Sequence, residues 1–368
     1  MPVDDADLFL SLPRRGQPTV RAEDHLTEER KANFRRTWAE HIEPVTQPGA
    51  DDFEDFYEEA ARLDAALWAF RPRHVWMAEY REGTARNLGT GEVVPLVQVQ
   101  HLRRYGGQPS TGSTGLPELV SEYEVERYHR FQAFRNHAGR PLVLAGTDLH
   151  GDGLELVDAV RQVAAQGYRE VVVKVTRAKY GIAAIDIAPH HTDADIEAAL
   201  SDGLDWALVS QGGRPDAFLV QGRVPMRFEY RVFVVGGVPV TGAGCIEEHT
   251  PANHRWDRFD TRVREHRSDP HSPVVEDPVL VRRLVQFAGE VAKQWKAERP
   301  DLGTAVIDVA LDGEGEPLVV EFNGLLSSGL YASDPRAVTV AVAADPQLPS
   351  LEERVVGRPV IVSQLFGE

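Results

Sequence analysis

The chain has 368 residues, of which 42% are hydrophobic and 26% are charged. This length and composition exclude a short peptide, a fibre and a disordered tail, and they favour a globular protein of two or three domains. Its 57 acidic and 40 basic residues give a formal net charge of -17, which disfavours binding to nucleic acid and to anionic membranes. We therefore expect neither of these as a partner.

The one cysteine of the sequence, Cys245, lies among small and apolar residues in TGAGCI. It cannot form an internal disulfide or a zinc–thiolate cluster, which is typical of an intracellular protein. We interpret Cys245 as a buried packing residue rather than a nucleophile. No run approaches the ~20 apolar residues of a membrane helix, and the first residues lack a basic secretory signal, so we expect a cytoplasmic location.

Residues 1–120 are predicted to form an acidic α/β domain with an accessory or specificity role. Helical periodicity is found at 27–41 and again after Asp52, where the acidic side of EDFYEEAARLD is either a solvated face or a docking surface for a basic partner. Alternating patterns in HVWMAEY and EVVPLVQVQHL predict two strands joined by a turn at 89–91, and 106–118 has the composition of a loop.

The rest of the chain mixes helices with hairpins. Helices are predicted at 124–136, at 153–166 with Gly167 as the stop, and after Asp277, which is the N-cap of a long helix that begins with Pro278. Strands are predicted at 141–146, 170–175, 182–187, 218–222, 228–235, 238–245, 305–311 and 318–323. This mixture predicts an α+β fold rather than a doubly wound parallel sheet.

The last predicted hairpin is a candidate cation site. If its turn pairs Leu311 with Leu318, the register places Asp308 opposite Glu321, with Asn323 on the same face. Two opposed carboxylates repel each other unless a cation lies between them, and a set of oxygen ligands suits Mg²⁺ that arrives with nucleotide phosphates. The alternative is a polar face in contact with water, and a slip of one residue would separate the carboxylates.

A lysine interrupts the valine-rich strand EVVVKV. Burial of Lys174 is costly without an anion, and a phosphate oxygen is one candidate partner. A lysine that reaches water from the strand end, or that pairs with an ordinary carboxylate, is the alternative. The next turn brings Lys179 and Gly181 to a position where charge and backbone N–H groups could close over phosphates. The sequence has neither a P-loop motif nor GxGxxG after a strand.

The hairpin MRFEYRVFVVGGVPVTGAGC carries charges on one face. Its two-residue Gly-Gly turn predicts a register in which Glu229 and Arg231 lie opposite Gly244 and Gly242. We expect these glycines to leave space for a ligand, and Arg231 to hold a phosphoryl group or a substrate carboxylate. An ion pair between Arg227 and Glu229 on a solvated face is the alternative.

Four motifs together, in chain order, resemble the ATP-grasp superfamily: the lysine strand EVVVKV, the strand FLVQ, the hairpin EYRVFVVGG and the closing hairpin DVALDGEGEPLVVEFN. The resemblance is to a divergent, carboxylate–amine ligase-like branch and covers residues 125–331. It implies an ATP-grasp-like two-lobed nucleotide-binding fold with an additional N-terminal α/β region. The N-lobe would be 121–220, the C-lobe 221–340, and 341–368 a C-terminal tail.

The same resemblance implies the site, with ATP between the two lobes. Asp308, Glu321 and Asn323 match the magnesium positions, although the family commonly has glutamate where Asp308 stands. Lys174 would contact the phosphates, and the segment around Gln221 would form the adenine hinge. A further lysine usually precedes the first strand of the nucleotide lobe. Here three arginines are the candidates to replace it: Arg130, Arg135 and Arg140.

The implied activity is that of an ATP- and Mg²⁺-dependent ligase. A substrate carboxylate would attack the γ-phosphate of ATP to give an acyl phosphate, and an amine or related nucleophile would displace phosphate, while Lys174 and Arg231 stabilise developing charge. Small-molecule and peptide substrates are both open, as is the oligomeric state. A phosphotransferase that stops at a phosphorylated product and a non-catalytic nucleotide-binding scaffold are the alternatives.

Two further segments carry polar residues near these motifs. In GLLSSGLY, the turn at 327–329 could meet an acyl or phosphoryl oxygen, or be a plain loop. The segment 247–267 holds His249, His254 and His266 with five arginines. It is a candidate for a zinc site, for a loop that closes over the active site, or for a solvated charged loop.

Overall fold

The computed structural model describes most of the second half of the chain and only isolated strands of the first. The described residues are 125, 127–146, 155–176, 182–210, 217–255, 257–325 and 328–344, with the strands 7–11, 74–81, 84–87, 93–95, 99–103, 107–109 and 360–364. The predicted helices at 27–41 and after Asp52, together with Lys179, Gly181 and Ser327, lie outside the described residues. Within the described residues, no helix is both long and apolar enough to span a membrane.

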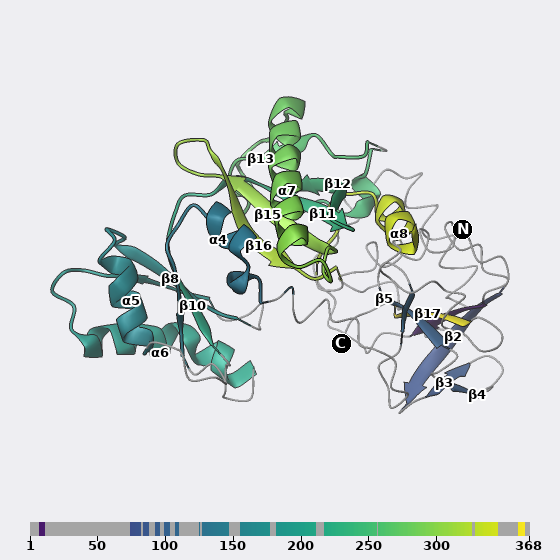
Figure 1. The fold of residues 1–368 in the computed structure, drawn as a ribbon, viewed down its shortest axis with the longest axis horizontal. Coiled ribbons are helices and arrows are strands. Elements are labelled where there is room, and N and C mark those ends of the chain that lie inside the picture. Colours follow the sequence, from purple (N-terminus) through teal and green to yellow (C-terminus); the bar gives the residue numbers. More distant parts are fainter. Residues whose placement is uncertain are drawn as a thin grey trace.

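Strands from the two ends of the chain form one seven-stranded sheet, at the right of Figure 1. Its order is β4-β3-β2-β1-β17-β5-β6. Strand β17 (Val360–Gln364) lies between β1 (Asp7–Ser11) and β5 (Val99–Arg103) and pairs with both in parallel. The segment predicted as a C-terminal tail therefore contributes a strand to the N-terminal sheet.

The hairpin predicted between 72 and 105 is wrong in one respect. Strand β2 (His74–Arg81) pairs with β3 (Thr84–Asn87), which was not predicted, and β3 then pairs with β4 (Val93–Pro95). Strand β6 (Gly107–Pro109) lies in the segment predicted as a loop and pairs with β5. Short strands of polar residues such as TARN carry no clear alternation, so the pattern could not indicate them.

The N-lobe is a four-stranded antiparallel sheet covered by two helices, at the left of Figure 1. Its strands have the order β7-β10-β8-β9: β7 (Leu142–Ala145), β10 (Phe218–Gly222), β8 (Glu170–Val175) and β9 (Ile182–Asp186). Helix α5 (Leu156–Ala164) is followed by Gly167 at φ 94°, as the sequence predicted, whereas α6 (Asp193–Ser210) was not predicted. Valines of β8 alternate with exposed or half-buried residues, which fits a strand with one buried face.

The C-lobe is built on a second four-stranded sheet with the order β12-β11-β15-β16. These strands are β12 (Val238–Gly244), β11 (Arg227–Val235), β15 (Ala305–Leu311) and β16 (Pro317–Asn323). Helix α7 (Pro278–Glu298) packs on the sheet and is capped as predicted, because the Asp277 side chain accepts hydrogen bonds from the backbone N–H groups of Val279 and Leu280.

The helix predicted at 124–136 is interrupted. A short 3-10 helix, η4 (Tyr128–Arg130), is separated from α4 (Gln132–His137) by Phe131 in an extended conformation. Both pieces pack into the C-lobe core, where the Phe131 ring lies against Trp295 and Phe322. The start of the segment predicted as the N-lobe therefore shares its core with the C-lobe.

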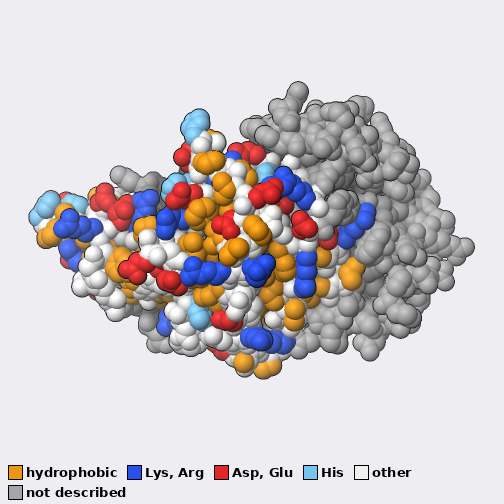
Figure 2. Space-filling view, turned by 90° about the horizontal axis from the view of Figure 1, so that it is seen from above, with side chains coloured by type: hydrophobic (Ala, Val, Ile, Leu, Met, Phe, Trp, Pro, Cys, Tyr) orange, Lys and Arg blue, Asp and Glu red, His pale blue; other side chains and the backbone are white. Residues whose placement is uncertain are grey.

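Further elements of the C-lobe were not predicted. The segment 247–267, which the sequence left as a charged loop, contains η5 (Pro251–Asn253) and β13 (Arg262–Arg264). Strand β13 pairs with β14 (Val274–Glu276). Helix α8 (Pro335–Ala344) packs against β11 and β12. On the face seen in Figure 2, the basic and acidic side chains of the described residues lie interspersed among apolar ones.

The β15–β16 hairpin contains a β-bulge that the sequence did not indicate. Beside the turn, Leu311 pairs with Pro317 and not with Leu318, as the sequence predicted. The register then shifts by one residue after Val309, so Asp308 lies opposite Glu321, as predicted. The prediction of this pair is confirmed, although the register from which it was derived is wrong at the turn.

A register shift in the β11–β12 hairpin has the opposite consequence. The register shifts between Phe233 and Val234, so Arg231 pairs with Ala243 rather than with Gly242. A Cβ atom at Gly242 would lie 2.6 Å from the Arg231 carbonyl oxygen, and one at Gly244 would lie 2.5 Å from the Arg262 carbonyl oxygen. These glycines therefore permit close backbone packing, and the prediction that they leave space opposite the charges is wrong.

Candidate functional site

Charged side chains from both lobes meet at the junction between β8 of the N-lobe and β16 of the C-lobe. The Lys174 Nζ atom donates a hydrogen bond to Glu321 Oε2. It also lies 3.4 Å from the hydroxyl oxygen of Tyr128, and it lies 5.6 Å from the centre of that ring. The two predicted site residues are thus direct partners, and Tyr128, which the sequence analysis did not single out, contacts Lys174.

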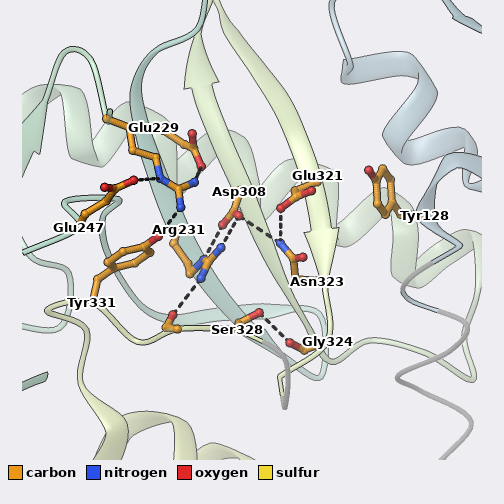
Figure 3. Close-up of polar contacts among 12 residues, drawn as sticks. Tyr128, Glu229, Arg231, Glu247, Asp308, Glu321, Asn323, Gly324, Ser328 and Tyr331 are labelled. Carbon is orange, nitrogen blue, oxygen red and sulfur yellow. Dashed lines mark hydrogen bonds and ion pairs between the residues drawn. The ribbon is translucent and has the colours of Figure 1, made fainter. Parts of the chain in front are cut away.

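A second ion pair lies within the C-lobe sheet (Figure 3). Arg231 and Asp308 are neighbours across β11 and β15, and the guanidinium donates from Nε to Oδ1 at 2.8 Å and from Nη2 to Oδ2 at 2.7 Å. The Asp308 side chain is fully buried, and the Arg231 side chain is 7% exposed. Arg231 also donates from Nη1 to the Gly329 carbonyl oxygen at 3.0 Å. This two-point geometry is the strongest form of an arginine–carboxylate contact.

Asn323 links the two ion pairs. Its Nδ2 donates to Asp308 Oδ2 at 3.1 Å and to Glu321 Oε1 at 3.0 Å (Figure 3). The three residues predicted as metal ligands therefore converge, as the register predicted. Together with Lys174 and Arg231 they form a single network, which we call the junction network.

The charges of the junction network reinforce each other. Burial disfavours the ionised form of Glu321, but the charge and hydrogen bond of Lys174 and the amide of Asn323 outweigh it and lower the pKa of Glu321 to about 2. Burial also disfavours the ammonium of Lys174, but Glu321 and Tyr128 outweigh it and raise the pKa of Lys174. Both groups are thus held in their charged forms at neutral pH.

A group of residues beside the network was missed by sequence reasoning. The Arg267 guanidinium donates to Glu229 Oε1 at 2.8 Å and to the Tyr331 hydroxyl at 2.9 Å, and it lies 3.6 Å from Glu247 Oε1 (Figure 3). Burial and the charge of Asp308 raise the pKa of Glu229 despite the nearby arginines. Only the arginine-rich composition of 247–267 hinted at this contact.

The alternative ion pair between Arg227 and Glu229 is not formed. Glu229 pairs with Arg267, and Arg227 instead lies 3.5 Å from Glu265. The charged face of the middle hairpin is therefore covered by side chains from the following segment.

Two other predicted residues have structural partners. Gln221 accepts a hydrogen bond from Arg140 Nε at 2.9 Å. Ser328 is buried and donates to the Gly324 carbonyl oxygen at 2.7 Å (Figure 3). Cys245 is buried as predicted, and burial raises the pKa of its thiol well above the usual value.

The zinc hypothesis for 247–267 finds no support in the described residues, which contain no cluster of three or more His, Cys, Asp or Glu placed to hold a metal ion. Much of the segment packs within the lobe through buried ion pairs. Arg262 donates to Asp260 and Arg264 to Glu248, and both arginine side chains are less than a tenth exposed.

The oxygen atoms of the junction network fit Mg²⁺ unevenly. Both carboxylate oxygens of Asp308 are engaged by Arg231, and its side chain is fully buried. Glu321 is 24% exposed and would be released for a metal once Lys174 turns to another anion. Asn323 would have to turn its amide over to offer the carbonyl oxygen. The hard-oxygen donor set suits Mg²⁺, with Glu321 as the accessible ligand and Asp308 as a residue fixed by Arg231.

The chain is similar to known ATP-grasp proteins. Residues 175–342 match a family described as an ATP-grasp domain, the third family of its clade, and this match begins directly after Lys174. No curated protein matches the sequence.

Solved structures with a similar chain path include two ligases and a macrocyclase. D-alanyl-alanine synthetase A from Vibrio cholerae is 13% identical, covers 88% of this chain and 89% of its own, and has a TM-score of 0.47. D-alanine-D-alanine ligase from Coxiella burnetii is 13% identical, with coverages of 95% and 94% and a TM-score of 0.42. The macrocyclase MdnC from Microcystis aeruginosa, bound with precursor peptide MdnA, is 10% identical, with coverages of 91% and 98% and a TM-score of 0.44.

Proposed function

Because the chain belongs to the ATP-grasp superfamily, with an ATP-grasp domain matched at residues 175–342, we propose that it is an ATP- and Mg²⁺-dependent ligase. In this proposal a substrate carboxylate attacks the γ-phosphate of ATP to give an acyl phosphate and ADP. An amine or related nucleophile then attacks the acyl carbon, the C–N bond forms, and phosphate leaves with the C–O bond electrons. Small molecules and peptides are both candidate substrates.

The observation that carries the proposal is the contact between Lys174 of the N-lobe and Glu321 of the C-lobe within the junction network. Cationic nitrogen and carboxylate oxygen atoms from two lobes lie in one place, where a single metal–nucleotide can reach both. Arg231 and Asp308 belong to the same network through Asn323. Separate locations for these groups would have argued against an ATP site.

Each residue of the network has a proposed role. Lys174 leaves Glu321 and binds a phosphate oxygen when nucleotide enters, and Glu321 and Asn323 become ligands of Mg²⁺. A bound Mg²⁺ ion neutralises phosphate charge and orients the γ-phosphate. Arg231 holds Asp308 and the Gly329 carbonyl and adds positive charge where the transferred phosphoryl group develops negative charge.

Two other proposed contacts belong to the nucleotide. Gln221 lies in the strand β10 that pairs with β8, so we place the adenine near it. Lys179, which lies outside the described residues, is proposed to contact the phosphates from the turn after β8. No protein nucleophile is needed, because the activated intermediate forms on the substrate.

The test is release of ADP by the purified protein with pooled carboxylic acids and amines, followed by mass spectrometry of the products. A ligase releases ADP and phosphate and yields a condensed product when both pools are present. Lys174→Met is expected to lower the rate by at least about 100-fold, since charge stabilisation by one such group contributes on that order. Lys293→Met, at an exposed position of α7, is the matched control and should leave the rate unchanged.

Other outcomes favour the alternatives. A stable phosphorylated product from one substrate alone would favour the phosphotransferase. ADP binding without ADP release under all mixtures would favour a non-catalytic nucleotide-binding protein. Full ATP consumption by Lys174→Met would contradict the proposed role of the junction network.

A further inference from the structure

Arg140 lies in the short link between α4 and β7, where the chain leaves the C-lobe core and enters the N-lobe sheet. The preceding residue, Gly139, has φ 63°, and a Cβ atom there would lie 3.2 Å from the Leu318 Cβ atom. Glycine therefore lets the link pass directly against β16. Helix α4 and β16 lie side by side in Figure 1 and contact each other. This path brings the Arg140 side chain to the backbone of β16.

The Arg140 guanidinium makes four hydrogen bonds. Nη1 donates to the Val319 carbonyl oxygen at 2.9 Å, and Nη2 donates to the Val320 carbonyl oxygen at 2.8 Å. Nη1 also donates to the carbonyl oxygen of Ala138 at 2.7 Å, which shapes the link, and Nε donates to Gln221 Oε1 at 2.9 Å. These bonds use four of the five N–H donors of an arginine. Arg140 is therefore mostly committed to the protein rather than available for a phosphate.

The two carbonyl groups on β16 mark the position of the bulge. The register of β15 and β16 shifts between Asp308 and Val309, because Val319 pairs with Val309 while Glu321 pairs with Asp308. Val320 is the extra residue on the bulged strand. A bulge disrupts the ladder and leaves backbone groups without their usual strand partner. Arg140 supplies hydrogen bonds to the carbonyl groups of both Val319 and Val320.

The bulge decides which face of the sheet Glu321 occupies. If the register beside the turn continued without a bulge, Glu321 would lie opposite Ile307, whose side chain is buried in the C-lobe core. With the bulge, Glu321 lies opposite Asp308, and Phe322 takes the core-facing position. The junction network therefore exists only in the bulged register.

We propose that Arg140 is a positioning residue that fixes the β16 bulge and thereby holds the Glu321 carboxylate in the metal- and nucleotide-binding network. Through Nε it ties the same strand to Gln221 in the N-lobe. Its importance for metal binding rests on the proposed function. A lysine at this position keeps the positive charge but cannot donate in a planar fork to two carbonyl groups and Gln221 together.

The experiment compares Arg140→Met and Arg140→Lys with a matched control, Arg283→Met. Arg283 contacts the turn of the same hairpin, where it donates to the Gly315 carbonyl oxygen and to Glu316, both at 2.8 Å. Affinity for Mn²⁺, as a hard-oxygen substitute for Mg²⁺, is measured by electron paramagnetic resonance with ADP present. ADP affinity is measured separately by calorimetry in EDTA, and amide hydrogen exchange is followed in the peptide 317–323.

Both Arg140 variants are expected to weaken Mn²⁺ binding by about 10- to 100-fold, the usual cost of losing a residue that orients a metal ligand. Affinity for ADP without metal should change much less, and exchange in 317–323 should rise. Arg283→Met should match the wild-type protein in Mn²⁺ affinity. If Arg140→Met does not fold, Arg140→Lys and its Mn²⁺ affinity decide the matter.

Two results distinguish failure of this inference from failure of the proposed function. If the wild-type protein binds Mn²⁺ with ADP and the Arg140 variants bind it equally well, Arg140 has no positioning role, although the proposed function stands. If the wild-type protein itself does not bind Mn²⁺ with ADP, the proposed function fails, and unchanged exchange in 317–323 would then also overturn the hold of Arg140 on the bulge. Wild-type affinity in Arg140→Lys alone would assign the effect to charge and overturn the role of the fork.

Discussion

The two ion pairs of the junction network have different surroundings. Arg231 and Asp308 are neighbours on adjacent strands of one sheet, and their side chains are 7% and 0% exposed. Lys174 and Glu321 come from separate lobes, and their side chains are 17% and 24% exposed. The first pair cannot separate without distortion of the sheet. The second can separate by a change at the lobe junction or by rotation of one lysine side chain.

This difference assigns different tasks to similar chemistry. A buried pair with both carboxylate oxygens bonded is a fixed part of the sheet, and removal of one partner leaves an uncompensated charge in the interior. A pair across two lobes exchanges one partner for another at lower cost, as a nucleotide site requires. We therefore expect Arg231–Asp308 to dominate stability and Lys174–Glu321 to dominate ligand binding.

The largest expected effect on stability follows from breaking the buried pair. Arg231→Met leaves Asp308 fully buried without its cation, so the free energy of unfolding should fall by about 3–5 kcal/mol. Urea unfolding followed by circular dichroism measures the change. The double variant Arg231→Met with Asp308→Leu removes both charges and should recover most of the loss. A loss below about 1 kcal/mol in the single variant would mean that the pair does not hold the sheet together.

The network also shows what the sequence could and could not predict. Asp308 and Glu321 were paired correctly because the period of two and the flanking apolar residues constrain which face each side chain takes. The turn residues gave the wrong partner for Leu311, and the bulge corrected the error. In the middle hairpin the same reasoning failed, because a register shift beside Val234 moved Arg231 opposite Ala243.

Bulges depend on contacts from distant parts of the chain, which local patterns do not contain. The carbonyl groups at the β16 bulge bind Arg140, which lies 179 and 180 residues earlier in the sequence. The contact of Tyr128 with Lys174 and the contact of Arg267 with Glu229 are likewise long-range. By contrast, the Asp277 cap and the stop at Gly167 are local, and the sequence predicted both.

A smaller effect is expected from acid, and it isolates the pair between the lobes. The pKa of Glu321 is lowered from 4.5 to about 2, so its ionised form stabilises the fold above about pH 4.5. That contribution is lost as the pH falls through the folded-state pKa. The stability difference between the wild-type protein and Glu321→Gln should therefore shrink by about 2 kcal/mol between about pH 5 and pH 2.

The comparison with Glu321→Gln is needed because other carboxyl groups titrate in the same range. The pKa values of Asp195, Glu248, Asp301 and Asp312 are also lowered, by hydrogen bonds or by nearby arginines, and both proteins share them. Their contributions cancel in the difference. Urea unfolding at several pH values gives the result, and a difference that stays constant down to about pH 2 would contradict the lowered pKa of Glu321.

The smallest expected effect comes from an exposed pair with nearly the same geometry. Arg283 lies 2.8 Å from Glu316 at the turn of the β15–β16 hairpin, close to the 2.7 Å between Arg231 and Asp308, but its side chain is 45% exposed and that of Glu316 is 71% exposed. Glu316→Ala should lower the free energy of unfolding by less than about 0.5 kcal/mol, because water and salt screen an exposed pair. Urea unfolding at low and high salt measures it. If the loss approached that of Arg231→Met, the distance between the charged atoms, and not burial, would set the energy, and the division of the two junction pairs into a structural and a ligand-binding pair would lose its physical basis.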